Sequence, residues 1–378
     1  MDEDFTAKAA GPFFPSTCHP SLSRRRFVAG GGALLGAAGV GIGAAPAVPD
    51  ATALISAHAG SAKDPWAVAH GIRAMGREFT LQDGRRAVDF LLQDVLAPVT
   101  VGQRRLLAFA LGTESHANSF LKTMLEAGVP LDYTFSHGGD KYRLQDIVDS
   151  AHALFRPREF TSDPQEIAWS LIALTRTTSP VRKRWTNAWR ESVDLDESVE
   201  MALRALEDAS APLAAAMRDG RPMTAKAPVH SFTCGGTHML YALVSATHYG
   251  FGLKGTRERV QQQVALMVWR TRADVDLMAR FYTDRKRSRV PLASWYELDS
   301  KLKLLGHAEE CFAMAVTRGV VTLAPAQAAQ REEAVATVKR LLADPRLRNL
   351  AEVRAMNIEA YRQLVGDMCH ARHGLVFA

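Results

Sequence analysis

Cysteine and histidine are scarce in this chain, yet they occur close together. The 378 residues include 4 cysteines and 12 histidines. After residue 47, each of the three cysteines has a histidine within four residues, in the pairs Cys234 and His238, Cys311 and His307, and Cys369 and His370. Thiolate and imidazole are preferred ligands of zinc, and imidazole also donates and accepts protons near neutral pH. This clustering indicates a site that either binds a metal or moves protons.

The segment around Cys234 has the features of a reactive thiol. A helix capped by Thr233 would carry Cys234 in its first turn and His238 one turn later on the same face. Thiols at a helix N-terminus have lowered pKa values, which favours the thiolate. Gly235 and Gly236 leave room for a second backbone or a ligand. We therefore expect Cys234 and His238 to be able to bind the same ion.

Three interpretations of these residues remain open from the sequence. In the first, Cys234, His238 and His307 bind a metal ion together with His370 or Glu310, zinc being the first choice and copper the second. In the second, no metal is bound, and His238 and His307 are the catalytic proton donor and acceptor across a central cavity. In the third, the glycines serve helix packing and the histidines only hydrogen-bond to the backbone.

Helices must position these residues. After residue 60, apolar residues recur three and four apart, a pattern typical of amphipathic helices. Helical stretches are expected at about 88–96, 105–111, 120–125, 166–174, 194–218, 235–249, 256–282, 295–318, 324–343 and 346–366. No alternating run is long enough for a convincing strand, and residues 134–139 are expected to form a loop with at most a short ribbon. The sequence thus predicts one all-α domain over residues 61–378.

The first 47 residues have the features of an export signal. Ser23-Arg24-Arg25-Arg26-Phe27 resembles the twin-arginine (Tat) consensus, and a weakly hydrophobic stretch rich in Gly and Ala follows. Ala45-Pro46-Ala47 fits the pattern of a signal peptidase site. We expect a Tat signal at 1–47, a linker at 48–60, and a periplasmic or secreted protein whose partner during export is the Tat machinery. Without cleavage, the same stretch would be an N-terminal membrane anchor.

Composition narrows the class of protein further. Charged residues make up 23% and hydrophobic residues 47% of the chain, which excludes a disordered chain and a disulfide-rich mini-protein. The net charge of +6 is small for this length, and no nucleic-acid partner is expected. Removal of Cys18 with the signal would leave three cysteines, an odd number that cannot pair completely within one chain.

Longer motifs surround the same cysteines and histidines. They are Glu-Ile-Ala-Trp-Ser-Leu at 166–171, Trp-Thr-Asn at 185–187, Cys-Gly-Gly-Thr-His-Met-Leu-Tyr-Ala-Leu at 234–243, Leu-Gly-His-Ala-Glu-Glu at 305–310 and Cys-His-Ala at 369–371. These segments resemble a family of uncharacterised exported bacterial proteins whose fold is similar to the α/α toroid of terpenoid cyclases and protein prenyltransferases. Leu305 stands where that family usually has Thr, Cys311 stands where it usually has Trp, and the family's Asp-Gly-Ser-Trp turn is absent.

The resemblance implies both a fold and a place for the site. The fold would be an α/α toroid, a ring of paired helices, or a closely related helical array. Cys234, His238, His307 and His370 would then converge at one end of the ring. Prenyltransferase toroids hold zinc at the ring mouth with an Asp, a Cys and a His, which agrees with the metal interpretation.

Two functions of different classes follow. An exported enzyme would act on a small or polymeric substrate in a central cavity, through its Cys and His residues. A non-catalytic envelope protein would instead use the basic segments 182–184 and 285–289 to bind a partner or an anionic membrane surface. The clustered Cys and His residues favour the enzyme. Glu114-Ser115-His116 lacks a hydrolase frame such as G-x-S-x-G, and no catalytic role is expected for it.

Overall fold

Helices make up most of residues 51–377, the part of the chain that this computed structural model describes. The helices are α1 (Ala51–Ala59), α2 (Pro65–Met75), α3 (Ala87–Phe90), α4 (Leu111–Glu114), α5 (Ser119–Glu126), α6 (Leu144–Leu154), α7 (Ile167–Thr177), α8 (Leu195–Arg218), α9 (Thr237–His248), α10 (Thr256–Arg287), α11 (Ala293–Thr317), α12 (Pro325–Leu342), α13 (Leu350–Met356) and α14 (Ile358–Phe377). The all-α class predicted from the sequence is confirmed. The expected Tat signal at 1–47 lies outside the described residues.

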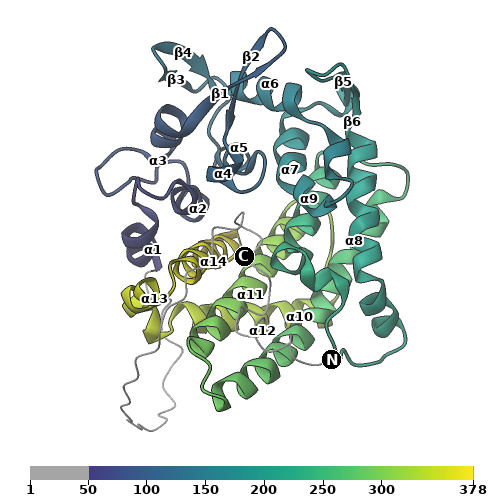
Figure 1. The fold of residues 1–378 in the computed structure, drawn as a ribbon. Coiled ribbons are helices and arrows are strands. Elements are labelled where there is room, and N and C mark those ends of the chain that lie inside the picture. The colour runs from purple at the N-terminus through teal and green to yellow at the C-terminus, as the bar shows by residue number, and fades with distance from the viewer. Residues whose placement is uncertain (1–50, 378) are drawn as a thin grey trace, which may run out of the picture.

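Three short antiparallel hairpins lie at one end of the molecule (Figure 1). Their strands are β1 (Leu96–Val101), β2 (Arg104–Phe109), β3 (Thr134–His137), β4 (Asp140–Arg143), β5 (Arg184–Thr186) and β6 (Ser192–Asp194). The expectation of helices through 96 and over 105–111 is wrong. A short apolar run fits either structure, and here Gly102 (φ 58°) turns the chain so that Leu96 pairs with Phe109. Residues 134–139 do form a ribbon, because Gly138 and Gly139 both adopt the positive φ of a tight hairpin turn.

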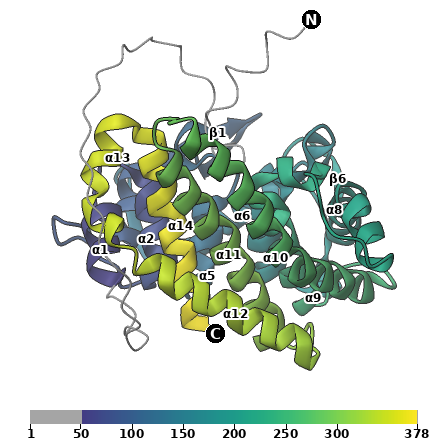
Figure 2. The same ribbon diagram turned by 90° about the horizontal axis from the view of Figure 1, so that it is seen from below.

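Six helices contact one another in a closed sequence. α2 packs against α5, α5 against α7, α7 against α9, α9 against α11, α11 against α14, and α14 again against α2. The remaining long helices pack against these six: α1 on α2, α6 on α7, α8 on α9, α10 and α12 on α11, and α13 on α14. Figures 1 and 2 show α2, α11 and α14 side by side. Each of the six therefore has neighbours of the same group on both sides.

α11 and α14 run parallel and very close together. Among the polar contacts that join them, three link residues 60 positions apart: Lys303 with Gln363, His307 with Asp367, and Glu310 with His370. A constant separation requires parallel helices. Glycine permits the close approach, since a Cβ added to Gly306 would lie 2.8 Å from Cα of Ala371, and one added to Gly374 would lie 2.9 Å from the nitrogen of Glu310.

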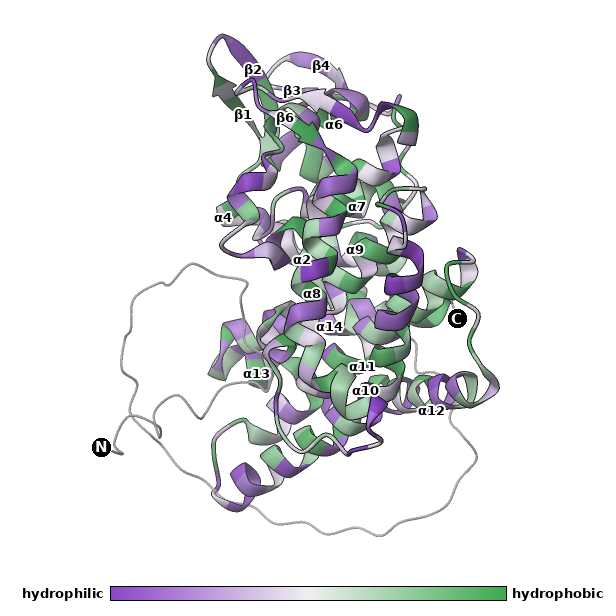
Figure 3. Ribbon diagram, turned by 90° about the vertical axis from the view of Figure 1, so that its right-hand side faces the viewer, coloured by the Kyte–Doolittle hydropathy of each residue, from purple (hydrophilic) through white to green (hydrophobic). Residues whose placement is uncertain are grey.

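Buried apolar side chains form a continuous core that extends from Ala51 to Ala371. Figure 3 shows hydrophobic residues along α9 and α11 and many hydrophilic residues along α8 and α12. The interior is not apolar throughout, because α2, α11 and α14 also bury charged and polar side chains. Among the described helices, none combines the length and the hydrophobicity that a membrane crossing requires.

Two boundaries differ from those expected. Residues 51–59, placed in a linker from the sequence, form α1, whose Ile55 and Ala59 are fully buried. The stretch expected at 346–366 is broken at Asn357, whose extended backbone separates α13 from α14. α14 then continues to Phe377, so Cys369 and His370 lie on a helix.

Candidate functional site

A cavity of about 70 Å³ lies where the six mutually contacting helices meet. Each of these helices contributes to its wall, for example through His70, Lys122, Trp169, His238, His307 and His370. One ordered water needs at least roughly 10–15 Å³ of such space, so this cavity has room for a metal ion with bound water or for a small ligand. Its lining is polar and aromatic.

The wall residues follow a helical repeat. On α2 and α14 they stand at positions i, i+4 and i+7: Trp66, His70 and Arg73 on α2, and Gln363, Asp367 and His370 on α14. On α11, Lys303 and His307 line the wall, and Glu310 continues the same spacing behind it. This spacing aligns side chains along one face of a helix. Each of the three helices thus presents a polar stripe to the interior.

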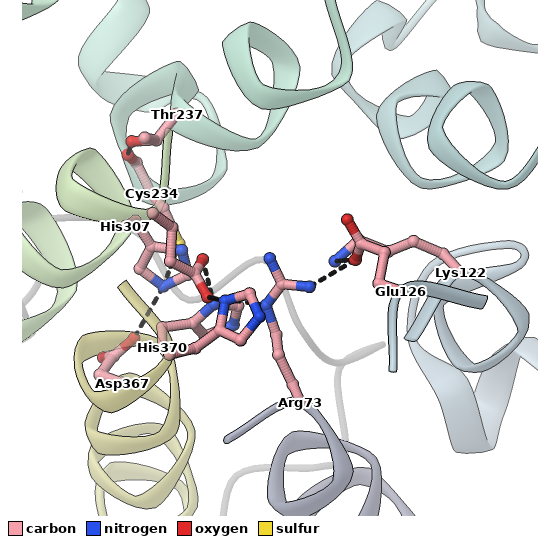
Figure 4. A network of polar contacts seen from close by, with 10 residues as sticks. Arg73, Lys122, Glu126, Cys234, Thr237, His307, Asp367 and His370 are labelled. Atoms are coloured by element: carbon pink, nitrogen blue, oxygen red, sulfur yellow. Dashed lines mark hydrogen bonds and ion pairs between the residues drawn. The ribbon is translucent and has the colours of Figure 1, made fainter. Parts of the chain in front are cut away.

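The structure brings together the four residues predicted from the sequence. Ligand atoms of Cys234, His238 and His307 all lie within 4.8 Å of one another. The ring centroid of His307 is 4.6 Å from that of His238 and 3.8 Å from that of His370. His370 also forms a second group, of the same closeness, with His307 and Glu310. Figure 4 shows Cys234, His307, Asp367 and His370 turned toward one another.

Cys234 does not lie on the same helix as His238, contrary to the sequence prediction. Cys234, Gly235 and Gly236 have φ of 50°, 65° and 81°, all left-handed, and α9 begins only at Thr237. Gly236, and not Thr233, is the N-cap residue of that helix, while the N–H and the hydroxyl of Thr233 both donate to Oε1 of Gln165. A left-handed conformation at a non-glycine residue costs about 1–3 kcal/mol. Cys234 therefore keeps its position against local strain.

Glu310 fixes His370 from behind. Nδ1–H of His370 donates to Oε2 of Glu310 at 2.7 Å, and Nδ1 of His373 lies 2.7 Å from Oε1. Arg73 donates to the same Oε1 at 2.8 Å and pairs with Glu126 at 2.5 Å. Both carboxylate oxygens of Glu310 are already in contact with other side chains. In the pair formed by Glu310 and His370, Nε2 of His370 is therefore the atom available to bind a metal. A carboxylate behind an imidazole is the usual support of a histidine that binds a metal.

Four histidines of the cavity, namely His70, His238, His307 and His370, have pKa values that keep them neutral near pH 7. Burial, which disfavours the charged imidazolium, lowers the pKa of His70 and of His307 to about 3. Burial also holds the pKa of His238 and of His370 well below the ordinary value, and in both cases neighbouring His307 lowers it further. Neutral imidazole has a lone pair for a metal or a proton, so these groups are ready to act as ligands or bases.

A second buried carboxylate, that of Asp367, reaches His307. Oδ1 of Asp367 lies 3.2 Å from Nε2 of His307, the nitrogen that also faces Cys234 Sγ at 3.5 Å. A Cys-His-Asp catalytic triad requires the thiol and the carboxylate to contact different nitrogens of the imidazole. Here both contact the same one. Instead, the thiol of Cys234 and the carboxylate of Asp367 both lie around one ring nitrogen of His307.

Glu114 and His116 are two of the cavity residues that were not predicted from the sequence. Glu114 accepts hydrogen bonds from the N–H groups of Asn118 and Phe120, and burial raises its pKa to about 8. His116 stacks on Trp169 with a centroid distance of 3.5 Å and contacts Glu166 at 2.7 Å. Both belong to Glu114-Ser115-His116, for which no role was expected. The only sequence pattern that could have indicated these two residues is a Glu and a His two positions apart, followed by an apolar helix.

One pair of ligand atoms has the separation expected at a tetrahedral zinc ion. With a Zn–S bond of ~2.3 Å and a Zn–N bond of ~2.0–2.1 Å, sulfur and nitrogen ligands of one tetrahedral ion are about 3.5 Å apart. Sγ of Cys234 and Nε2 of His307 have this separation. The donor set of one thiol and neutral imidazoles suits zinc, and it also suits copper. Cys311 and Cys369 are free thiols outside the cavity wall.

Comparison of the chain with protein-family models, with curated proteins and with solved structures gave no match.

Proposed function

We propose that the protein is a metal-dependent enzyme with a buried zinc site formed by Cys234, His238 and His307. The observation that carries the proposal is the closeness of these three ligand atoms in a polar cavity, with a sulfur–nitrogen distance suited to zinc. Three protein ligands and one open position are typical of catalytic rather than structural zinc. Zinc held there would supply a Lewis acid that activates water or polarises a substrate oxygen.

The remaining residues have separate tasks in this proposal. His370, held by Glu310, faces the open position and accepts or donates a proton there. If no water is bound to the ion, His370 is instead its fourth protein ligand. Lys122 and Arg73 share Glu126 at 3.0 and 2.5 Å, so their positive charges are largely balanced within the wall. Asp367 lies beside the metal position, since its Oδ1 is 3.2 Å from Nε2 of His307.

A larger outer cavity lies next to this site. It has a volume of about 670 Å³, and Trp66 belongs to its lining as well as to that of the inner cavity. Thr113 and Arg362 line the outer cavity, while their chain neighbours Glu114 and Gln363 line the inner one. We infer that substrate enters through the outer cavity and that only its reacting part passes Trp66, because the inner space is small.

The fold and the location belong to the same proposal. We infer an α/α toroid in which the six mutually contacting helices form the inner ring, and the closed sequence of contacts and the inward polar stripes support this. A Tat-exported protein would meet its substrate in the periplasm or outside the cell, or at the membrane if the signal is retained. Replacing Arg24 and Arg25 by Lys should then block export, measured with a reporter that requires a folded passenger.

Metal content is the decisive test. Protein purified from its export compartment without chelators should carry about one zinc per chain by elemental analysis. Cys234→Ala and His238→Ala should lower zinc affinity by more than about 100-fold, the upper range for residues that merely orient a ligand. Cys311→Ala is the matched control, since it removes an equally buried thiol outside the cavity, and it should retain zinc. Copper in place of zinc would change only the identity of the metal.

Metal-free protein that is active would favour a second candidate, in which His238 and His307 act as acid and base without a metal. Their rings are 4.6 Å apart, and Asp367 contacts one of them. The two candidates differ in one measurement, because a chelator abolishes activity only in the first. A non-catalytic envelope protein acting through the basic segments 182–184 and 285–289 would keep its binding when Cys234, His238 and His307 are all replaced.

A further inference from the structure

A buried ionic network lies directly behind the turn that carries Cys234. Arg270, on α10, donates from Nε to Oδ2 of Asp274 at 2.8 Å and from Nη2 to the carbonyl oxygen of Gly235 at 2.8 Å. Nε2 of His230 lies 2.8 Å from the other oxygen of Asp274. The side chains of all three are at most 2% exposed. None of the three belongs to the cavity wall.

The network supports the backbone at its strained point. Gly235 stands between Cys234 and Gly236, in the middle of the three consecutive left-handed residues. Such a conformation persists only where its surroundings hold it. Gly236 is already tight, because an added Cβ would lie 2.7 Å from Cγ2 of Val229. The guanidinium of Arg270 is a charged group that contacts this turn directly, through its hydrogen bond to the carbonyl oxygen of Gly235.

Stability alone gives no reason for these charges to be buried here. A buried ion pair often contributes no more than well-packed apolar residues of the same size. Arg270 donates from two separate nitrogens of its planar fork, one toward a carboxylate and one toward a carbonyl oxygen, whereas lysine has only one nitrogen with which to reach both. Burial by itself would raise the pKa of Asp274, but Arg270 and His230 hold that pKa below its usual value, so the carboxylate stays ionised. The fork is thereby fixed in orientation.

We propose that Arg270 is a positioning residue, which, with Asp274 and His230 behind it, holds the Cys234–Gly236 turn so that Sγ of Cys234 points at His307. The inference rests on the proposed metal site and adds a residue that no spacing in the sequence singles out. Outer residues that orient metal ligands change metal affinity by roughly 10- to 100-fold when they are replaced. Loss of Arg270 should therefore weaken metal binding through Cys234 without removing any ligand.

Cobalt(II) is the probe, because thiolate coordination gives it a charge-transfer band that reports the metal–sulfur bond. Arg270→Met should bind cobalt roughly 10- to 100-fold more weakly than wild type and show a reduced charge-transfer band. Arg270→Lys should not restore the band, since it keeps the charge but not the fork. Asp274→Asn, which preserves shape, gives the same test if Arg270→Met does not fold. Arg259→Met is the matched control, because Arg259 also lies on α10 and pairs with Glu200 and Glu207 away from the turn.

The outcomes separate this inference from the function it rests on. Wild-type protein that binds no cobalt would overturn the proposed metal site and this role with it. The positioning role alone would be overturned if folded Arg270→Met or Asp274→Asn bound cobalt as tightly as wild type and gave the same charge-transfer band. An equal loss of cobalt affinity in Arg259→Met would also overturn the positioning role, since the loss would then come from a lower stability of the whole fold.

Discussion

Sγ of Cys234 lies 3.5 Å from Nε2 of His307, although 73 residues separate the two in the chain. Cys234 reaches this position from a left-handed turn before α9, and His307 from the middle of α11. The two helices are neighbours in the interior, and α14 adds His370 and Asp367 from the other side of α11. The candidate site is thus a product of helix packing, and it should respond to changes that alter the packing as well as to changes of its ligands.

Trp66 should control access to the inner cavity. Its ring lies 3.9 Å from that of His70, packs over Gly366 and forms part of both cavities. Trp66→Ala should therefore speed the removal of bound zinc by a chelator roughly tenfold, which corresponds to about 1.4 kcal/mol off the opening barrier. It should also lower the free energy of unfolding by about 3–5 kcal/mol.

Trp66→Phe is the control for this change, because it keeps an aromatic ring between the two cavities. The rate of zinc loss, followed with a colorimetric chelator, should stay near that of wild type. An equal rate of zinc loss in wild type and Trp66→Ala would show that the metal leaves by another route.

Gly306 should be irreplaceable for the packing of α11 on α14. An added methyl group would lie 2.8 Å from Cα and 2.9 Å from the nitrogen of Ala371, and backbone atoms cannot move aside independently. Gly306→Ala should lower the free energy of unfolding by about 1–3 kcal/mol, in spite of alanine's higher helix propensity. It should weaken metal binding too, since His307 is the next residue. Denaturant unfolding and cobalt titration measure the two effects.

Gly112→Ala provides the comparison. Gly112 is also helical, on α4, and nothing lies within 4 Å of an added Cβ there. That variant should be as stable as wild type or more stable, by up to about 1 kcal/mol. If both alanine variants behaved alike, close approach of α11 and α14 would not be the cause.

The metal-free protein should show opposite pH effects from two buried groups. His70 has its pKa lowered by burial to about 3, so the folded chain binds fewer protons than the unfolded chain between pH ~6.5 and ~3. Its contribution to stability is therefore lost as the pH falls below ~6.5. Between pH ~7.5 and ~5.5, wild type should lose about 1 kcal/mol more than His70→Gln. Denaturant unfolding in the presence of a chelator measures this difference.

Glu114 should act with the opposite sign. Burial raises its pKa to about 8, so the folded chain binds more protons than the unfolded chain between pH ~4.5 and ~8. Over the same pH interval, wild type should gain stability relative to Glu114→Gln as the pH falls. A difference of the same sign for His70→Gln and Glu114→Gln would contradict the assignment of these two groups as neutral in the folded protein.

Much of the helical framework could be predicted from the sequence. The long amphipathic stretches that became α8, α10, α11 and α12 carry a repeat of three and four residues that identifies them locally. The wrong predictions concerned segments whose local sequence fits both a helix and a strand. The apolar runs near Leu96 and Leu107 are too short to distinguish a strand from a helix, and the pairing that decides between them is with another segment.

The sequence by itself determined which residue types were available for chemistry, and the pairing of each cysteine with a nearby histidine was enough to select Cys234, His238, His307 and His370. Only the tertiary structure decided that Cys234 and His307 join one cavity while Cys311 and Cys369 stay apart from it. It also placed Glu114, Arg73 and Arg270 in the interior. The physical reason is that a charged residue on a helix looks the same in sequence whether its face meets water or another helix. Which face is buried depends on the neighbouring helices, and these come from distant parts of the chain.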